Sequence, residues 1–365
     1  MRLAPVLLSL GLALGQLAAQ APSGVPSVRS TERSATKVAE GIYVIRHPDA
    51  PNGFPQGNTT VVIGSRSVLV VDSDYMPSSA REDIAQIKQW TDKPVRYLVN
   101  THWHFDHTFG NGAYAAAFPG LDIIAHVETA TQMVGWNAAW RKGFVERNAA
   151  LKQRVEAGVD AAGKPAGDSA RAAAKRQLET RERIWSEFEH YQITDPTLRF
   201  DRDFQIDLGN RTVWIKYLGR GNTTGDAVVY VPDAKLIATG DLLVHPVPYL
   251  AGGHPAELAA GLETIGRMDV STIVPGHGEI QRDKAFLRSV AEFIRIVVAQ
   301  VDKDFFTYGT SWGNVAKIKE SVTAAIDLPG WRQRFTKGDP DNASFFDNFT
   351  YPGLIEAAYA VAWGR

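Results

Sequence analysis

Three histidines and one aspartate lie within six residues of this chain, in the segment HWHFDH at positions 102–107. The segment follows an apolar run, Val95–Val99, of the kind that forms a buried strand. In an extended or turning segment alternate side chains face the same way, so the first two histidines can converge on one ion. Imidazole nitrogens and carboxylate oxygens suit zinc, and also iron or manganese. The pattern therefore predicts a metal site at the end of a strand, with a histidine-rich surface loop as the alternative.

The H-x-H-x-D-H pattern after a strand resembles the signature of the metallo-β-lactamase-fold hydrolases. Three further segments resemble that family and occur in the family's order. The first, residues 58–73, is similar to an opening hairpin that closes on an aspartate, here Asp72. The other two are Thr239-Gly240-Asp241 and the V-P-G-H-G segment at 274–278. The resemblance thus covers residues 58–278 and implies a four-layer αββα sandwich.

The same resemblance implies a set of metal ligands. A first ion would be held by His102 and His104, and Asp241 would bridge it to a second ion. The remaining ligands of the second ion would be Asp106, His107 and His277. The expected cofactor is zinc, as one or two ions, with iron or manganese as alternatives.

One position departs from the family pattern. The family's glycine-rich turn reads G-x-G-H-T-x-G-D, whereas residues 219–226 read GRGNTTGD, so Asn222 stands where a third imidazole is expected. An amide oxygen is a weaker zinc ligand than imidazole, so the first ion should bind loosely. Three arrangements stay open: Asn222 ligates through its oxygen, the first site fills only with substrate, or the protein uses one ion in the second site. His245 and His254 are candidate substitutes, although a hydrogen-bonding role on a loop is the more ordinary one.

The chemistry that such a site supports is hydrolysis. A divalent ion lowers the pKa of bound water from near 15.7 to about 7, and a second ion can hold the oxygen that develops charge. We expect a metal-bound hydroxide, oriented by Asp106 or Asp241, to cleave an ester, lactone, thioester or amide-type bond of a small molecule. Tyr249 lies in a segment expected beside Asp241, where it would either donate a hydrogen bond to a developing oxyanion or simply pack.

Three other functions remain open at this stage. A β-lactamase is one, although a bridging aspartate resembles the thioesterase, lactonase and phosphodiesterase branches of the family more closely. An iron-dependent dioxygenase of sulfur compounds is the second, because the altered first site suits a single three-ligand ion. The third is a degenerate protein that binds metal without catalysis, and only Asn222 points to it.

The N-terminus predicts export. Met1-Arg2 is followed by an apolar run, Leu3–Leu17, and by small residues up to Ala21, which is typical of a signal peptide over residues 1–21. The run is too short to span a bilayer comfortably, so we expect the signal peptide to be removed, which leaves a periplasmic or secreted protein without membrane contact; a retained anchor is the alternative. The chain has no cysteine, which excludes disulfides and thiolate ligands. Its net charge of −1 provides no field for nucleic acid, so a small-molecule substrate is expected.

Strands alternate with helices over residues 37–310, which predicts an α/β protein. A helix is expected at Ser79–Trp90, between two prolines. An amphipathic helix is expected at Asp283–Asp304. The predicted strands are Gly41–Arg46, Thr60–Ile63, Ser67–Val71, Val95–Val99, Thr212–Tyr217, Ala227–Val231 and Leu236–Thr239.

Residues 127–191 are rich in alanine and lack strand character, so they predict an inserted helical hairpin. Its flexible connection would be Gly158–Gly167, and Asp168 or Ser169 would cap the second helix. The hairpin is expected either to pack outside the sandwich or to form a lid, with Trp136 and Trp140 lining the substrate pocket.

Residues 311–365 predict a helical C-terminal extension packed on the same domain. The extension is rich in aromatic side chains, which are more typical of a core than of a pocket. The alternative is that these aromatic side chains form a homodimer interface. The aromatic residues of the extension are Trp312, Trp331, Phe335, Phe345, Phe346, Phe349 and Tyr351.

Overall fold

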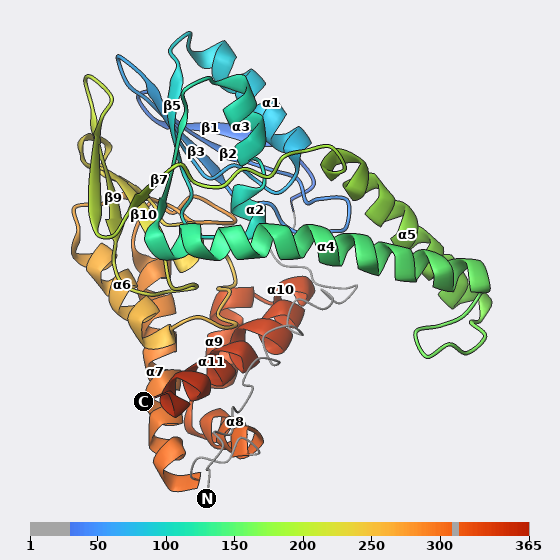
Figure 1. The fold of residues 1–365 in the computed structure, drawn as a ribbon. Coiled ribbons are helices and arrows are strands. Elements are labelled where there is room, and N and C mark those ends of the chain that lie inside the picture. The colour runs from blue at the N-terminus through green and yellow to red at the C-terminus, as the bar shows by residue number, and fades with distance from the viewer. Residues whose placement is uncertain (1–29, 309–313, 365) are drawn as a thin grey trace, which may run out of the picture.

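Two β-sheets, packed face to face, form the centre of the molecule (Figure 1). The computed structural model describes residues 30–308 and 314–364, so the expected signal peptide and Trp312 lie outside the described residues. Among the described helices, none combines the length and apolar character needed to cross a lipid bilayer.

The first sheet has seven strands in sequence order, antiparallel from β1 to β4 and parallel from β4 to β7. Its strands are β1 (Ser34–Ala39), β2 (Ile42–Arg46), β3 (Thr59–Ile63), β4 (Val68–Val71), β5 (Val95–Val99), β6 (Asp122–His126) and β7 (Leu198–Phe200). The second sheet has the order β12-β11-β10-β9-β8, and only β11 and β12 are parallel. Its strands are β8 (Asp203–Asp207), β9 (Thr212–Tyr217), β10 (Ala227–Val231), β11 (Leu236–Ala238) and β12 (Thr272–Val274).

Alternation along the strands explains why both faces of each sheet are covered. In β4, Leu69 and Val71 face the other sheet, whereas Val68 and Val70 face the helices outside. Because successive side chains point to opposite faces, a continuous run of β-branched residues fills two apolar layers at once. The short strands predicted from such runs are confirmed within one residue at each end.

Helices cover both outer faces, so the expected four-layer αββα sandwich is confirmed. The first sheet is covered by α1 (Pro77–Trp90) and α3 (Asn111–Ala117), and the short α2 (Phe105–Thr108) precedes α3. The second sheet is covered by α6 (Pro255–Arg267) and α7 (Ala285–Tyr308). Helix α1 begins two residues before the predicted start, because proline is well tolerated in the first turn of a helix.

The insertion forms a helical hairpin of α4 (Val127–Ala157) and α5 (Asp168–Phe188), whose far end projects away from the sandwich (Figure 1). Two details differ from expectation. The cap of α5 is Gly167, and Asp168 lies in its first turn, where a negative charge is favourable. The connection is held by hydrogen bonds, among them those from two backbone N–H groups to Asp160 Oδ1, rather than being a free linker.

The lid alternative placed Trp140 in the substrate pocket, but the structure buries its side chain in an aromatic cluster. Its ring packs edge-on against Phe109 and Phe188, with centroids 4.8 Å apart in both cases, and the side chain is buried. This aromatic cluster attaches the base of the hairpin to the segment that follows α2. Trp140 therefore has a packing role. Trp136, one turn earlier, lies beside Trp103, whose ring contacts that of His104.

The described part of the C-terminal extension packs on α6 and α7 and shares one core with them. It consists of α8 (Val315–Ala325), α9 (Leu328–Thr336), α10 (Pro340–Phe345), a π-helical turn η4 (Phe346–Thr350) and α11 (Tyr351–Trp363). Its aromatic side chains contribute to that core: Trp331, Phe335, Phe345, Phe346 and Tyr351 are buried, and Phe349 packs against them.

Candidate metal centre

The candidate ligands gather where strands of both sheets end. Strands β4 and β5 run parallel, so Asp72 and the 102–107 segment emerge at the same edge of the first sheet. Strands β11 and β12 also run parallel, which brings Asp241 and His277 to the facing edge of the second sheet. Main-chain hydrogen bonds join the two edges, since Ala227 N–H donates to the Thr101 carbonyl at 2.8 Å. The site thus lies between the sheets, at their carboxyl ends.

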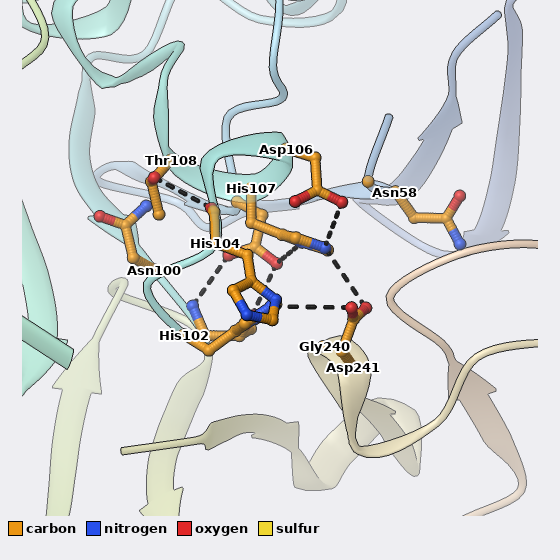
Figure 2. A network of polar contacts seen from close by, with 12 residues as sticks. Asn58, Asn100, His102, His104, Asp106, His107, Thr108, Gly240 and Asp241 are labelled. Atoms are coloured by element: carbon orange, nitrogen blue, oxygen red, sulfur yellow. Dashed lines mark hydrogen bonds and ion pairs between the residues drawn. The ribbon is translucent and has the colours of Figure 1, made fainter. Parts of the chain in front are cut away.

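Two groups of side chains bring their ligand atoms within 4.8 Å of one another. One group contains His102 and His104 with Asp241. The other contains Asp241 again, with Asp106, His107 and His277. Figure 2 shows His107 lying between Asp106 and Asp241, with His102 and His104 on the near side of the same carboxylate. The structure therefore brings together six of the seven predicted ligands, and Asp241 is common to both groups.

The distances within the second group are short. His277 Nε2 lies 3.1 Å from Asp106 Oδ2 and 3.1 Å from His107 Nε2. His107 Nε2 lies 3.3 Å from Asp241 Oδ1. All these side chains are buried. Their ligand atoms thus converge on one small volume.

The protonation of two imidazoles is set by their other nitrogens. His107 Nδ1 donates to Asp72 Oδ2 at 2.9 Å, and His277 Nδ1 donates to the Gln56 carbonyl at 3.1 Å. Each Nε2 atom then points into the cluster, where it can offer a lone pair to an ion that displaces its proton. A carboxylate or carbonyl behind a histidine fixes the ring in this way in many metal sites.

Two consecutive hydrogen bonds through the Thr101 hydroxyl connect His102 to Asp72. The Thr101 hydroxyl donates to Asp72 Oδ2 at 2.8 Å, which leaves its oxygen free to accept from His102 Nδ1 at 3.0 Å. His102 Nε2 is buried without a hydrogen-bond partner and lies 3.7 Å from Asp241 Oδ2. Asp72 therefore supports two of the four histidines of the site from behind.

The electrostatics of the cluster favour a cation. Burial lowers the pKa of His107, but Asp241 and Asp106 outweigh this effect and raise it well above its usual value. Burial likewise opposes the ionisation of Asp241, but His107 and His277 hold its pKa well below the usual range. In contrast, burial and the neighbouring His107 keep the pKa of His102 low, so this ring is neutral. The carboxylates are thus ionised and His102 is neutral, as a divalent ion requires of its ligands, whereas His107 carries a proton that a bound ion would displace.

The positions of the ligand atoms also fit a bound metal ion. The Nε2 atoms of His107 and His277 lie 3.1 Å apart, so without an ion one of them must donate a proton to the other, and a bound cation would take the place of that proton. His102 Nε2 and Asp241 Oδ1 are buried polar atoms without hydrogen-bond partners, which is costly in a folded protein. A metal ion coordinated by these atoms would satisfy both.

Comparison with known proteins agrees with this geometry. The family model described as the metallo-beta-lactamase superfamily matches residues 52–277. The chain belongs to this superfamily. The metallo-beta-lactamase from Pontibacter korlensis has the same fold, with a TM-score of 0.50 and 17% identity over 72% of this chain and 99% of that one. The lactamase-like protein aptB of Emericella nidulans is 34% identical over 101 residues, 27% of this chain. The match spans 32% of aptB, about a third of its length.

Membership in the superfamily makes Asn222 the most informative position of the site. Its side chain is buried and its Nδ2 lies 3.4 Å from His104 Nδ1, so it lies beside the ligand group of His102 and His104. The nitrogen and oxygen of an asparagine amide are exchanged by a simple flip, which would turn Oδ1 toward His104. The seventh predicted ligand therefore lies next to the first site, where its amide oxygen can act as a weak ligand.

Asn222→His is expected to strengthen metal binding at the first site. An imidazole supplies a better ligand than an amide for zinc, so the variant should bind close to two ions per chain under conditions where the natural protein binds fewer. Elemental analysis after dialysis against limiting zinc measures the ratio. Asn222→Gln keeps the amide and serves as the control. Identical stoichiometry and affinity in all three proteins would remove residue 222 from the metal site.

Neither substitute histidine belongs to the described ligand groups. The His245 ring packs edge-on against Phe286 at 4.8 Å, and burial lowers its pKa to about 4. His254 precedes the first residue of α6, and its backbone N–H donates to the Gly221 carbonyl at 2.7 Å. Neither side chain has the expected capping or hydrogen-bonding role, because the Nδ1 atom of each is buried without a hydrogen-bond partner and the His254 side chain does not cap α6.

Two supporting residues were not anticipated from the sequence. Thr101 positions His102, and the place of Thr101 directly before the motif could have suggested it. Gln56 supports His277 through its backbone carbonyl, which no side-chain pattern reveals. Gly57 follows it, and a Cβ there would lie 2.6 Å from the His107 ring, so only glycine fits.

A second buried group of ionisable side chains lies outside the metal centre and was not predicted. His47 Nδ1 contacts Asp74 Oδ1 at 2.9 Å, and its Nε2 contacts Asp83 at 3.0 Å. Arg33 also donates to Asp83, at 2.8 Å. Burial opposes protonation of His47, but Asp74 and Asp83 outweigh it and raise its pKa well above the usual value. This group, His47, Asp74, Asp83 and Arg33, forms a buried ion network.

Proposed function

We propose that this protein is a zinc-dependent hydrolase that cleaves an ester, lactone, thioester or amide-type bond of a small molecule. The observation that carries the proposal is the position of Asp241, whose two oxygens lie beside His102 on one side and His107 on the other. A carboxylate in that position can serve two adjacent metal sites. The N-terminal residues 1–21 support a periplasmic or secreted location.

One or two metal ions would be held by the two ligand groups that share Asp241. When bound, a divalent ion supplies a Lewis acid and lowers the pKa of water to about 7. The chain's own carboxylates, Asp106 and Asp241, are ionised and can orient the attacking water by accepting a hydrogen bond from it. Asp72, Thr101 and Gln56 keep the imidazoles in the orientation that this chemistry requires.

Tyr249 is the proposed donor to the oxygen that becomes negative during attack. Burial, together with the nearby charges of Asp241 and Asp106, raises its pKa to about 12. The phenol therefore stays protonated at neutral pH and can donate a hydrogen bond. A preorganised donor at a developing oxyanion contributes about 10²- to 10³-fold to the rate.

The aromatic surroundings of the ligands support a substrate with an apolar group beside the scissile bond. The half-buried Trp103 ring lies 4.5 Å from the His104 ring and 4.9 Å from Trp136 of α4. Phe105, next to Asp106, lies 4.8 Å from Phe54. Of the hairpin proposed as a lid, the segment around Trp136 is the part positioned for this role, because the far end projects away from the sandwich (Figure 1).

A hydrolysis screen with defined metals tests the function. The metal-free protein and the protein loaded with zinc, manganese or iron are each given nitrocefin, a lactone, a thioester and a phosphodiester. We expect hydrolysis of the lactone or thioester by the zinc-loaded protein and none by the metal-free protein. Hydrolysis of nitrocefin alone would make it a β-lactamase. Protein shown by elemental analysis to carry metal, yet inactive on every substrate, would contradict the proposal.

A further inference from the structure

The segment that carries Tyr249 runs from η2 (Gly240–Leu242), which holds Asp241, to the start of α6. We call residues 244–253 of this segment the Tyr249 loop. Val247 and Leu250 of the loop are buried in the core that also contains the C-terminal extension. We propose that the extension fixes this loop, with Thr350 and Gly353 as positioning residues that hold the Tyr249 hydroxyl toward the substrate. The inference rests on the proposed function, in which Tyr249 stabilises the developing oxyanion.

Thr350 makes the first attachment. Its hydroxyl donates to the Pro248 carbonyl at 2.7 Å, across 102 residues of sequence, and its side chain is fully buried. A buried hydrogen bond of this kind fixes a backbone position, because breaking it leaves a carbonyl without a partner away from water. The attached carbonyl belongs to the residue directly before Tyr249.

Gly353 makes the second attachment, on the other side of Tyr249. A Cβ added at Gly353 would lie 2.6 Å from the Cβ and 2.7 Å from the Cα of Ala251. The backbone of α11 therefore lies directly against the loop, at a distance that only glycine allows. Tyr249 lies between these two attachment points, and the intervening Leu250 is buried in the core shared with the extension.

A π-helical turn lies next to both attachment points in the extension. The π-helical turn η4 ends at Thr350, immediately before α11 begins. A π-helical turn contains an extra residue and so rotates the helix that follows it, and such turns are frequent at functional sites. The ring of Phe345, the last residue of α10, lies 6.4 Å from the Tyr249 ring, so the extension also contacts the tyrosine itself.

Thr350→Val tests the attachment with a side chain of the same shape but no hydroxyl. Because the Tyr249 hydroxyl is proposed to act in the transition state, kcat should fall about 10- to 100-fold while KM changes less than about twofold. Thr350→Ser restores the hydroxyl and should recover activity to within about threefold of the natural protein. Metal content per chain should be the same in all variants.

Tyr351→Phe is the matched control. It removes the Tyr351 hydroxyl, whose hydrogen bond at 2.7 Å is to Thr323 within the extension. A double-mutant cycle then separates positioning from general damage: in a Tyr249→Phe background, Thr350→Val should have no further effect on kcat. Equal losses in both backgrounds, or equal losses from Thr350→Val and Tyr351→Phe, would overturn the proposal.

Hydrogen exchange provides a readout that does not depend on activity. Peptides covering residues 244–253 should exchange faster in Thr350→Val than in the natural protein, and at the natural rate in Tyr351→Phe. If Thr350→Val does not fold, Gly353→Ala tests the other attachment in the same way. Unchanged exchange in the loop would overturn the attachment even if the protein proves to be a hydrolase. Faster exchange in a protein that hydrolyses nothing would refute the proposed function alone.

Discussion

Asp241→Asn is expected to lower hydrolysis at least about 10³-fold, equivalent to about 4 kcal/mol of transition-state stabilisation, and to lower metal binding at both sites. The substitution keeps the size of the side chain but removes the charge that both ligand groups share. One group would lose its only carboxylate, and the other would keep only that of Asp106. No other described residue belongs to both groups, so this single change should have the largest functional effect.

Metal binding by this variant can be measured without a substrate. A ligand present at a hundred times its Kd stabilises the folded protein by about 2.7 kcal/mol, which raises the midpoint of thermal unfolding by several degrees. Zinc should produce this shift in the natural protein and a much smaller one in Asp241→Asn. Asp304→Asn, the same change at a buried carboxylate of α7 away from the site, is the control. Equal metal content and equal rates in the two variants would refute the role of Asp241.

Asp83→Ala is expected to destabilise the protein by about 3 to 5 kcal/mol, because it leaves two cations of the buried ion network without their shared carboxylate. Asp83 is fully buried and contacts both His47 and Arg33. Its neighbour Glu82 is exposed and lies 3.9 Å from the same arginine. Glu82→Ala is therefore the matched control, and it should change stability by no more than about 0.5 kcal/mol.

Urea unfolding at pH 6 measures the difference, and its pH dependence gives a second check. Burial opposes the ionisation of Asp83, but His47 outweighs it and lowers its pKa, so its contribution is present above pH 3.8 and is lost as the pH falls through the lowered value. The raised pKa of His47 means that its contribution is present below pH 6.5 and is lost as the pH rises through the raised value. The gap between the two variants should thus be widest between these limits. A gap below about 1 kcal/mol at pH 6 would show that the network adds little stability.

The local part of the metal centre could be predicted because its cause is local. Alternation along an extended segment orients His102 and His104 together, and the following short helix turns Asp106 and His107 toward the same volume. Asp241 and His277 have no such local signal. They were assigned through resemblance to a family, and the structure brings them to the site because two pairs of parallel strands end at facing edges.

Other features depended on contacts that no local pattern encodes. The ion network joins His47 in a loop, Asp74 after β4 and Asp83 in α1, residues without a common motif or spacing. Trp140 and Trp136 lie one turn apart on the same helix and both pack against one aromatic cluster, yet Trp140 is buried whereas Trp136 also lies beside Trp103. The elements that pack against each turn of the helix decide between these environments, and periodicity identifies only that a face is apolar.

The α/β class, the strands and the clustering of histidines could be predicted from the order of the residues, because side-chain alternation and burial act over a few residues. In contrast, it is the packed fold that places Asn222 beside His104, Asp72 behind two imidazoles and Thr350 against the Tyr249 loop. These contacts join residues 29 to 118 positions apart. Such pairs meet only when the sheets and helices have packed, since their geometry is set by the whole fold and not by the chain near either residue.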